Sequence, residues 1–168
     1  MKLWELLLKI ISIFIGYTPD VDDTPSSEEE PKKITPPIKV RDDNNRLKEE
    51  LRQLPDHNEK LHDLILDLQE FVYDRFNKEL TITMIYRTQA EQDRIYANDP
   101  RYQERPFKSP HQFWHALDLR SFIFTADEIM QIEDYLNDKY NSSNYYQWTA
   151  KHYNMGLGDH FHIQLYEV

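Results

Sequence analysis

Four residues in the C-terminal half of the chain have types and spacings that suit metal coordination. His111 and Asp118 lie seven positions apart, and His160 and His162 flank Phe161 near the end of the sequence. Because residues i and i+2 of a strand point to the same face of a sheet, a strand here presents His160 and His162 side by side. Imidazoles and carboxylates are common zinc ligands, so the pattern predicts a metal site.

The absence of cysteine narrows the chemistry further. A chain with no cysteine excludes disulfide scaffolds, thiolate zinc fingers, iron–sulfur clusters and cysteine nucleophiles. His111 and His115 also have the spacing of helical zinc proteases, but Gln112 stands where those enzymes need a glutamate base. The histidines and carboxylates must therefore form a different kind of site.

The elements that position these residues follow from periodicity and capping signals. Two capping boxes, Thr88–Glu91 and Thr125–Glu128, predict helix starts. Alternating residues predict strands at 80–86, near 116–122 and at 160–165. We expect helices at 46–54, from Pro55-Asp56 to about Phe76, after Thr88 and from Thr125 to about Tyr140, and an irregular loop around Pro100, Pro106 and Pro110. This irregular order predicts an α+β fold, a small antiparallel sheet with flanking helices.

The N-terminal part divides into two segments ahead of the domain. Residues 1–17 are mostly apolar with a narrow polar stripe. They fit a signal peptide, a helix lying in the membrane interface or a helix docked on a partner protein, and membrane association is favoured. Residues 18–45 contain five of the nine prolines and an acidic run, which predicts an extended linker. The domain then covers residues 46–168.

Charge excludes one class of partner. Lys and Arg total 20 against 30 Asp and Glu, which gives a formal charge of −10. Nucleic-acid binding depends on a surplus of cationic side chains that neutralise phosphates. We therefore expect no nucleic-acid partner.

Three segments together carry a resemblance to a known family. Ser109, His111, Ala116 and Asp118 fit a Ser-x-His-x-x-Gly-x-Ala-x-Asp pattern, with Trp114 in place of the glycine. The acidic-x-x-His pattern is met by Asp159 and His162, and a tyrosine-arginine turn before a Gln-bearing helix is met by Tyr86-Arg87-Thr88 and Gln92. Over residues 80–166 the chain resembles the zinc D-alanyl-D-alanine carboxypeptidases. That family includes phage L-alanyl-D-glutamate endopeptidases and shares its fold with the hedgehog signalling domain.

The resemblance implies a role for each matching residue. It implies His111, Asp118 and His162 as ligands of Zn²⁺. It also implies Asp159 as the general base and His160 as the transition-state stabiliser. The reverse assignment, with His160 as the base, stays open. Arg87 would face the substrate carboxylate or the oxyanion. Ser109 would orient the substrate or a ligand. Trp114 replaces a glycine, so we expect the turn there to have a different backbone.

The expected activity is zinc-dependent hydrolysis of peptidoglycan peptides at D-amino acids. D-Ala-D-Ala carboxypeptidase action is expected first because Arg87 offers a partner for a terminal carboxylate. The alternatives are an L-Ala-D-Glu endopeptidase, a zinc-containing binding module without catalysis, and a metal-free fold with core histidines. A membrane-associated or exported location fits residues 1–17, and a cytoplasmic one stays open.

Overall fold

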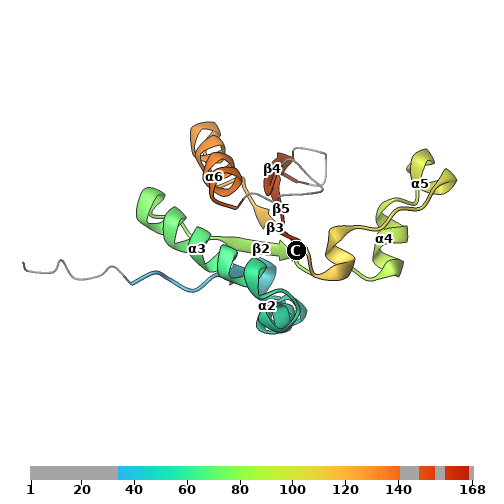
Figure 1. The fold of residues 1–168 in the computed structure, drawn as a ribbon, viewed down its shortest axis with the longest axis horizontal. Coiled ribbons are helices and arrows are strands. Elements are labelled where there is room, and N and C mark those ends of the chain that lie inside the picture. The colour runs from blue at the N-terminus through green and yellow to red at the C-terminus, as the bar shows by residue number, and fades with distance from the viewer. Residues whose placement is uncertain (1–33, 141–147, 154–157, 167–168) are drawn as a thin grey trace, which may run out of the picture. The chain divides into compact units, whose positions relative to one another are not determined.

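The described residues centre on a mixed five-stranded sheet. The computed structural model describes residues 34–140, 148–153 and 158–166, so the predicted leader 1–17 lies outside them. Strands β1 (Lys39–Val40), β2 (Thr81–Met84), β3 (Ala116–Arg120), β5 (His160–Gln164) and β4 (Ala150–Tyr153) lie in that order across the sheet (Figure 1). No helix in the described part of the chain is long and apolar enough to span a membrane.

The α+β class is confirmed, but the prediction of a purely antiparallel sheet is wrong at one edge. The β2–β3, β3–β5 and β4–β5 pairs are antiparallel, whereas β1 and β2 are parallel. The connection from β1 to β2 runs through two helices, and such a crossover brings the chain back in the same direction. A two-residue strand is too short to show an alternating pattern in the sequence.

Strand β1 also moves the domain boundary. Lys39 and Val40 pair with Thr81 and Ile82, although the composition places them in the 18–45 linker. The compact unit that contains the sheet begins at Lys33, not near position 46. Proline-rich composition does not exclude an edge strand, because a short edge strand needs few backbone donors.

The helices follow the capping signals with two exceptions. They are α2 (Asn45–His57), α3 (Glu59–Phe76), α4 (Gln89–Ile95), α5 (Pro100–Glu104) and α6 (Ala126–Lys139). Both predicted capping boxes are present, at Thr88 and Thr125. The predicted start of α3 at Pro55-Asp56 is wrong, since Pro55 lies in the last turn of α2 and Asn58 caps α3. Helix α5 replaces part of the expected loop, with Asp99 as N-cap and Pro100 in its first turn.

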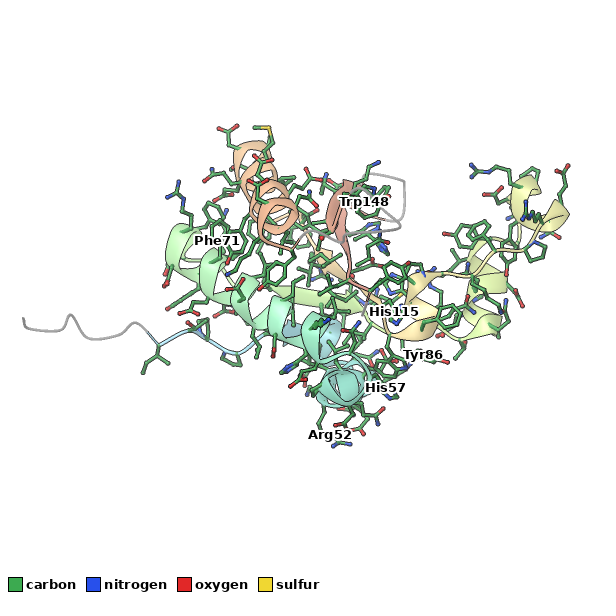
Figure 2. All side chains as sticks on the ribbon, viewed as in Figure 1. Arg52, His57, Phe71, Tyr86, His115 and Trp148 are labelled. Carbon is green, nitrogen blue, oxygen red and sulfur yellow. The ribbon has the colours of Figure 1, made fainter. Side chains whose placement is uncertain are left out.

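One face of the sheet carries the hydrophobic core. Leu117, Leu119, Phe161 and Ile163 are fully buried and belong to one cluster with leucines and isoleucines of α3 and α6. Figures 1 and 2 show α3 and α6 packed along the strands, with side chains filling the space between the layers. Burying such a side chain stabilises the fold by about 1.5–3 kcal/mol.

The opposite face of the sheet carries polar side chains, because successive side chains of a strand point to opposite faces. Asp118 pairs with His162, and Arg120 pairs with His160. A register shift between Ile82 and Met84 puts Ile82 opposite the core residue Leu119 and Met84 opposite Asp118. A bulge of this kind re-aims a side chain, so Met84 joins the polar face.

Asn58 connects three parts of the fold through one buried side chain. Its Oδ1 accepts a hydrogen bond from the Leu61 N–H at 3.0 Å and so caps α3. Its Nδ2 donates to the carbonyls of Trp114 at 3.2 Å and Leu165 at 3.0 Å. The side chain therefore fixes the turn before β3 and the end of β5 to the start of α3.

We expect Asn58→Asp to destabilise the protein by about 2 kcal/mol or more, although aspartate is as good a helix cap as asparagine. The carboxylate keeps the acceptor for Leu61 but faces two carbonyl oxygens without a donor. Asn44 caps α2 as an acceptor from Arg46 and Leu47 and is exposed, so Asn44→Asp is the matched control and should change stability by less than about 0.5 kcal/mol. Urea unfolding of both variants measures the difference, and equal stabilities would contradict the bridging role.

Candidate metal centre

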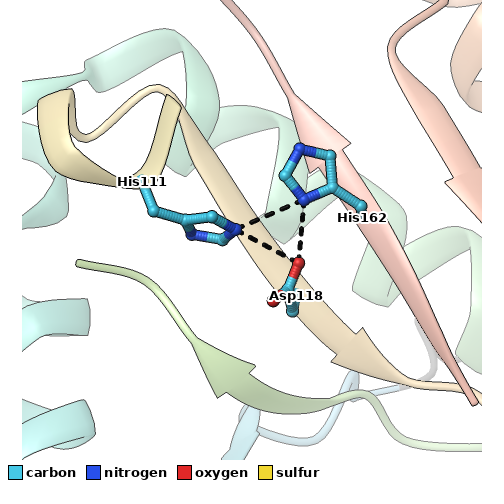
Figure 3. Close-up of side chains that lie close together, drawn as sticks. All are labelled: His111, Asp118 and His162. Atoms are coloured by element: carbon cyan, nitrogen blue, oxygen red, sulfur yellow. Dashed lines mark hydrogen bonds and ion pairs between the residues drawn. The ribbon is translucent and has the colours of Figure 1, made fainter. Parts of the chain in front are cut away.

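Three side chains that lie far apart in the sequence converge on the polar face of the sheet. His111 Nε2 lies 3.3 Å from His162 Nδ1 and 3.3 Å from Asp118 Oδ1, and His162 Nδ1 lies 2.9 Å from Asp118 Oδ1 (Figure 3). These residues form a group that could hold a metal ion. They are the three residues for which the sequence predicts a ligand role.

Three elements, β3, β5 and the short helix before β3, position the three side chains. Asp118 and His162 are direct partners across the β3–β5 ladder, so their side chains leave the sheet on the same face. His111 comes from the 3₁₀ helix η2 (Pro110–Phe113), which immediately precedes β3. Its side chain is buried at 1% exposure, while those of Asp118 and His162 are 12% and 16% exposed. The group is therefore mostly buried, and its remaining contact with solvent comes from Asp118 and His162, with almost none from His111.

A carbonyl oxygen selects the His111 tautomer. His111 Nδ1 lies 2.8 Å from the Ile85 carbonyl oxygen. A carbonyl only accepts hydrogen bonds, so Nδ1 carries the proton and the Nε2 lone pair faces Asp118 and His162. Histidines that bind metals typically hold their other ring nitrogen in this way.

Asp118 is held as a carboxylate. Burial alone would raise its pKa, but the adjacent His111 and His162 rings, when protonated, favour the carboxylate through charge and hydrogen bonding, and this opposite effect is the stronger one. The net effect lowers the pKa of Asp118 far below its ordinary value. An ionised carboxylate is the form that coordinates a cation.

The spacing of the three donor atoms fits a tetrahedral ion. Zinc bonds to His nitrogen and carboxylate oxygen are about 2.0–2.2 Å long, which puts tetrahedral ligand atoms about 3.3–3.5 Å apart. The observed separations of 2.9, 3.3 and 3.3 Å are close to that value. Two neutral imidazoles and one carboxylate would leave a divalent ion with net positive charge and an open coordination position.

Arg87 lies beside this group as a buried cation. Its exposed fraction is 8%, and its guanidinium donates to Gln92 Oε1 at 3.0 Å and contacts Met84 Sδ at 2.9 and 3.3 Å. Met84 is in turn the strand partner of Asp118. Among the described residues no carboxylate pairs with Arg87. A buried, unpaired guanidinium is costly, which makes it a candidate partner for an anionic ligand.

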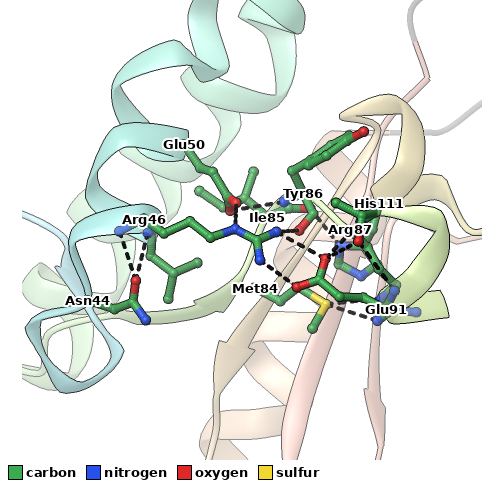
Figure 4. A network of polar contacts seen from close by, with 11 residues as sticks. Asn44, Arg46, Glu50, Met84, Ile85, Tyr86, Arg87, Glu91 and His111 are labelled. Carbon is green, nitrogen blue, oxygen red and sulfur yellow. Dashed lines mark hydrogen bonds and ion pairs between the residues drawn. The ribbon is translucent and has the colours of Figure 1, made fainter. Parts of the chain in front are cut away.

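A polar network fixes the backbone around Arg87 (Figure 4). Arg46 on α2 donates to the Tyr86 carbonyl at 3.1 Å and binds Glu91 and Glu50, and Glu50 accepts from the Tyr86 N–H at 3.2 Å. The Arg87 N–H donates to the His111 carbonyl at 3.2 Å. Helix α2 thereby holds both backbone polar groups of Tyr86, the residue between the Ile85 carbonyl and Arg87.

The other predicted site residues lie near the group but outside it. His160 shares the sheet face of His162, stacks on Tyr153 at 5.9 Å and places Nδ1 2.8 Å from the Gly158 carbonyl. Asp159 is exposed and comes directly before β5. Ser109 is buried at the N-cap position of η2, where its N–H donates to Gln112 Oε1 at 3.0 Å. Their catalytic and substrate-binding roles stay predictions.

Trp114 has the backbone that glycine adopts most readily. Its φ of 61° and ψ of 24° are left-handed, a conformation that glycine adopts without a Cβ penalty, and a turn different from the family's stays a prediction. The ring stacks on His57 at 4.1 Å and on Tyr86 at 5.1 Å. These stacks and the Asn58 bond offset a conformation that costs about 1–2 kcal/mol for a residue with a Cβ.

Two aromatic residues, one on β4 and one just before it, adjoin the group, and the sequence assigned neither of them to the site. The Trp148 ring lies 6.0 Å from the His162 ring, and the Tyr153 ring lies 6.3 Å from it. Burial raises the pKa of Tyr153, and nearby Tyr96 and Asp118 raise it further, which places its hydroxyl in the same electrostatic neighbourhood as the ligand group. Strand β4 is short and has no alternating pattern, so only its closeness in sequence to His160 could have signalled it.

Comparisons of the chain with models of protein families, with curated proteins and with solved structures give no match. The site is therefore interpreted from its own geometry and from the motif resemblance.

We expect the purified full chain to bind one equivalent of Zn²⁺, and Asp118→Asn and His162→Ala to abolish stoichiometric binding because each removes one of three ligands. His160→Gln should keep one equivalent, since His160 lies on the same face two residues away but outside the group. Mass spectrometry measures the zinc content of each variant, and competition against a chromophoric chelator measures its zinc affinity. Retention of tight binding in His162→Ala would contradict the assignment.

Hydrogen bonding to Arg46 lowers the pKa of Glu91 to about 2, against partial opposition from burial. A lowered pKa in the folded state adds stability above the unfolded value near 4.5, and this stability is lost as pH falls from about 4.5 toward 2. We therefore expect the wild type to exceed Glu91→Gln in stability most at pH 6 and progressively less toward pH 3. Urea unfolding across this range tests it, with the exposed Glu104→Gln as control for loss of a charge. A pH-independent gap would contradict the ion-pair origin.

Proposed function

We propose that this chain is a zinc-dependent peptidase that hydrolyses peptide bonds at D-amino acids in peptidoglycan peptides, with D-Ala-D-Ala carboxypeptidase activity. The observation that carries the proposal is the convergence of His111, Asp118 and His162 at tetrahedral ligand spacing on the polar face of the sheet. The choice of substrate rests on the family resemblance of the three sequence segments. A Zn²⁺ ion held by these residues would polarise a scissile carbonyl and lower the pKa of water.

Arg87 supports the carboxypeptidase over the endopeptidase. Its guanidinium is buried next to the strand partner of Asp118 and has no carboxylate partner among the described residues. A forked guanidinium binds a terminal carboxylate through two parallel hydrogen bonds. A substrate held in this way would place its last peptide bond beside the ligand group, because Arg87 and His111 are joined through their backbones.

Asp159 and His160 are proposed to move the proton and steady the transition state. The exposed carboxylate of Asp159 can take a proton from the attacking water and return it to the leaving D-alanine amine, while the peptide C–N bond breaks. The bond from His160 Nδ1 to the Gly158 carbonyl leaves Nε2 to face the reaction. A protonated His160 would donate from Nε2 to the developing oxyanion. With a neutral ring, the same atom could act as the base instead.

Location is proposed from the N-terminal segments alone. Residues 1–17 would associate with a membrane as an anchor or an export signal, and the acidic linker would let the domain reach peptidoglycan from that surface. Residues 1–33, which contain the leader and the first part of the 18–45 linker, lie outside the described residues.

Incubation of the full chain with muropeptides, zinc-loaded or treated with chelator and followed by mass spectrometry, tests the activity. We expect loss of one terminal D-Ala in the zinc-loaded sample only. We expect Asp159→Ala to lower kcat by about 10²–10⁴-fold with zinc still bound. Asp134→Ala, an exposed aspartate on α6, is the matched control and should leave kcat unchanged.

Other outcomes would redirect the proposal. A cut between L-Ala and D-Glu would show the endopeptidase. Full activity of Asp159→Ala with loss in His160→Gln would make His160 the base. No cleavage by a folded, zinc-replete chain would contradict the enzyme and favour a zinc-containing binding module.

A further inference from the structure

A strip of cationic and aromatic side chains lies beside the metal ligands on the same sheet face. The strand register forms two rows across β3, β5 and β4. The first row is Asp118, His162 and Lys151, and the second is Arg120, His160 and Tyr153. Directly paired residues of antiparallel strands share a face, so Lys151 and Arg120 lie on the face that carries the ligand group.

These two cations have no carboxylate partner among the described residues. Lys151 Nζ instead lies over the rings of Trp148 at 5.9 Å and Tyr153 at 5.5 Å, and the Arg120 guanidinium lies 5.2 Å from the Phe122 ring. Aromatic faces hold a cation without neutralising it. In a chain with a formal charge of −10, Asp118 is the single acid in the two rows, and the ligand group already uses it. The strip is therefore suited to binding an anion.

The strip adjoins the ligand group directly. The Trp148 and Tyr153 rings lie 6.0 and 6.3 Å from the His162 ring, and Figure 2 shows Trp148 on the β4 side of the sheet. Lys151 is exposed and is the strand partner of His162. A ligand at the metal centre would reach this strip without leaving the sheet face.

Arg87 lies at the opposite side of the ligand group. It contacts Met84 on β2, and the rows then continue through β3 and β5 to β4. Three strand spacings of about 4.8 Å separate β2 from β4, or about 14 Å. An extended peptide advances about 3.3–3.6 Å per residue, so about four residues, or three residues and one extended side chain, span the distance between the two cationic positions.

We propose that Lys151 and Arg120, framed by Trp148 and Tyr153, form a subsite for a second carboxylate of the substrate. The inference rests on the proposed function. With the terminal carboxylate at Arg87 and the last peptide bond at the ligand group, the residue before the two D-alanines extends toward β4. The favoured substrates are D-Ala-D-Ala peptides in which that residue has an acidic side chain. Stem peptides with diaminopimelate, whose side chain ends in a carboxylate beside an ammonium group, also offer this second carboxylate, and those with lysine do not.

The test measures how fast the zinc-loaded full chain hydrolyses three peptides. They are Nα-acetyl-Glu-D-Ala-D-Ala, the corresponding diaminopimelate peptide and Nα-acetyl-Lys-D-Ala-D-Ala. We expect kcat/KM for the two carboxylate-bearing peptides to exceed that for the lysine peptide by about tenfold, mainly through KM. Lys151→Met should remove most of this preference and Lys151→Glu should reverse it. Lys60→Glu, an exposed lysine on α3, changes the net charge equally and should leave the preference intact.

Equal kcat/KM for all three peptides would overturn the subsite and leave the peptidase proposal standing. Release of D-alanine from none of them would overturn the peptidase proposal. Calorimetric binding of the same peptides to the zinc-loaded chain then tests the subsite separately. Tighter binding of the glutamate peptide that Lys151→Glu abolishes would support the subsite, and equal binding would overturn it.

Discussion

The antiparallel register of β3 on β5 is the constraint on which the site depends. It places Asp118 opposite His162 on one face and Leu119 opposite Phe161 on the other. Because side chains alternate, a slip of one residue would turn both polar side chains into the core and expose the apolar pair. The core side chains are fully buried, and each stabilises this register by about 1.5–3 kcal/mol. Hydrophobic burial on the far face thus sets the distance between two candidate ligand atoms with which the core side chains make no contact.

The third member of the group depends on contacts outside the β3–β5 ladder. His111 lies on a short 3₁₀ helix, and it is oriented by the Ile85 carbonyl and followed by the left-handed turn at Trp114. That turn is held by Asn58 at the α2–α3 junction, and the segment after Ile85 is held by Arg46. The two helices between β1 and β2 therefore stabilise the one of these three ligand candidates that is not on a strand.

The sequence predicted what depends on local pattern and missed what depends on tertiary pairing. Capping boxes at Thr88 and Thr125 are local signals and are confirmed, and the i, i+2 spacing of His160 and His162 correctly places them on one face. The family resemblance implied His111, Asp118 and His162 as ligands, and the structure brings these three residues together. Strands β1 and β4 are short edge strands whose residues carry no alternation, so only their pairing with β2 and β5 defines them. Pro55 signalled a helix start, but a proline is also tolerated close to a helix end when the next junction residue, Asn58, supplies the cap.

The chain has a negative net charge, whereas the cationic side chains around the ligand group give that region a positive local charge. Screening by salt explains how the two can coexist. A formal charge of −10 is spread over the whole chain, whereas Arg87, Arg120 and Lys151 lie on or beside the sheet face of the ligands. At physiological ionic strength the Debye length is about 8 Å, so exposed charges farther away contribute little at the site. The strand register keeps Arg120 and Lys151 within one or two strand spacings of His162, about 5–10 Å. An anionic peptide near the ligand group is therefore governed by the local cations, while the net acidity still opposes the extended phosphate contacts of a nucleic acid.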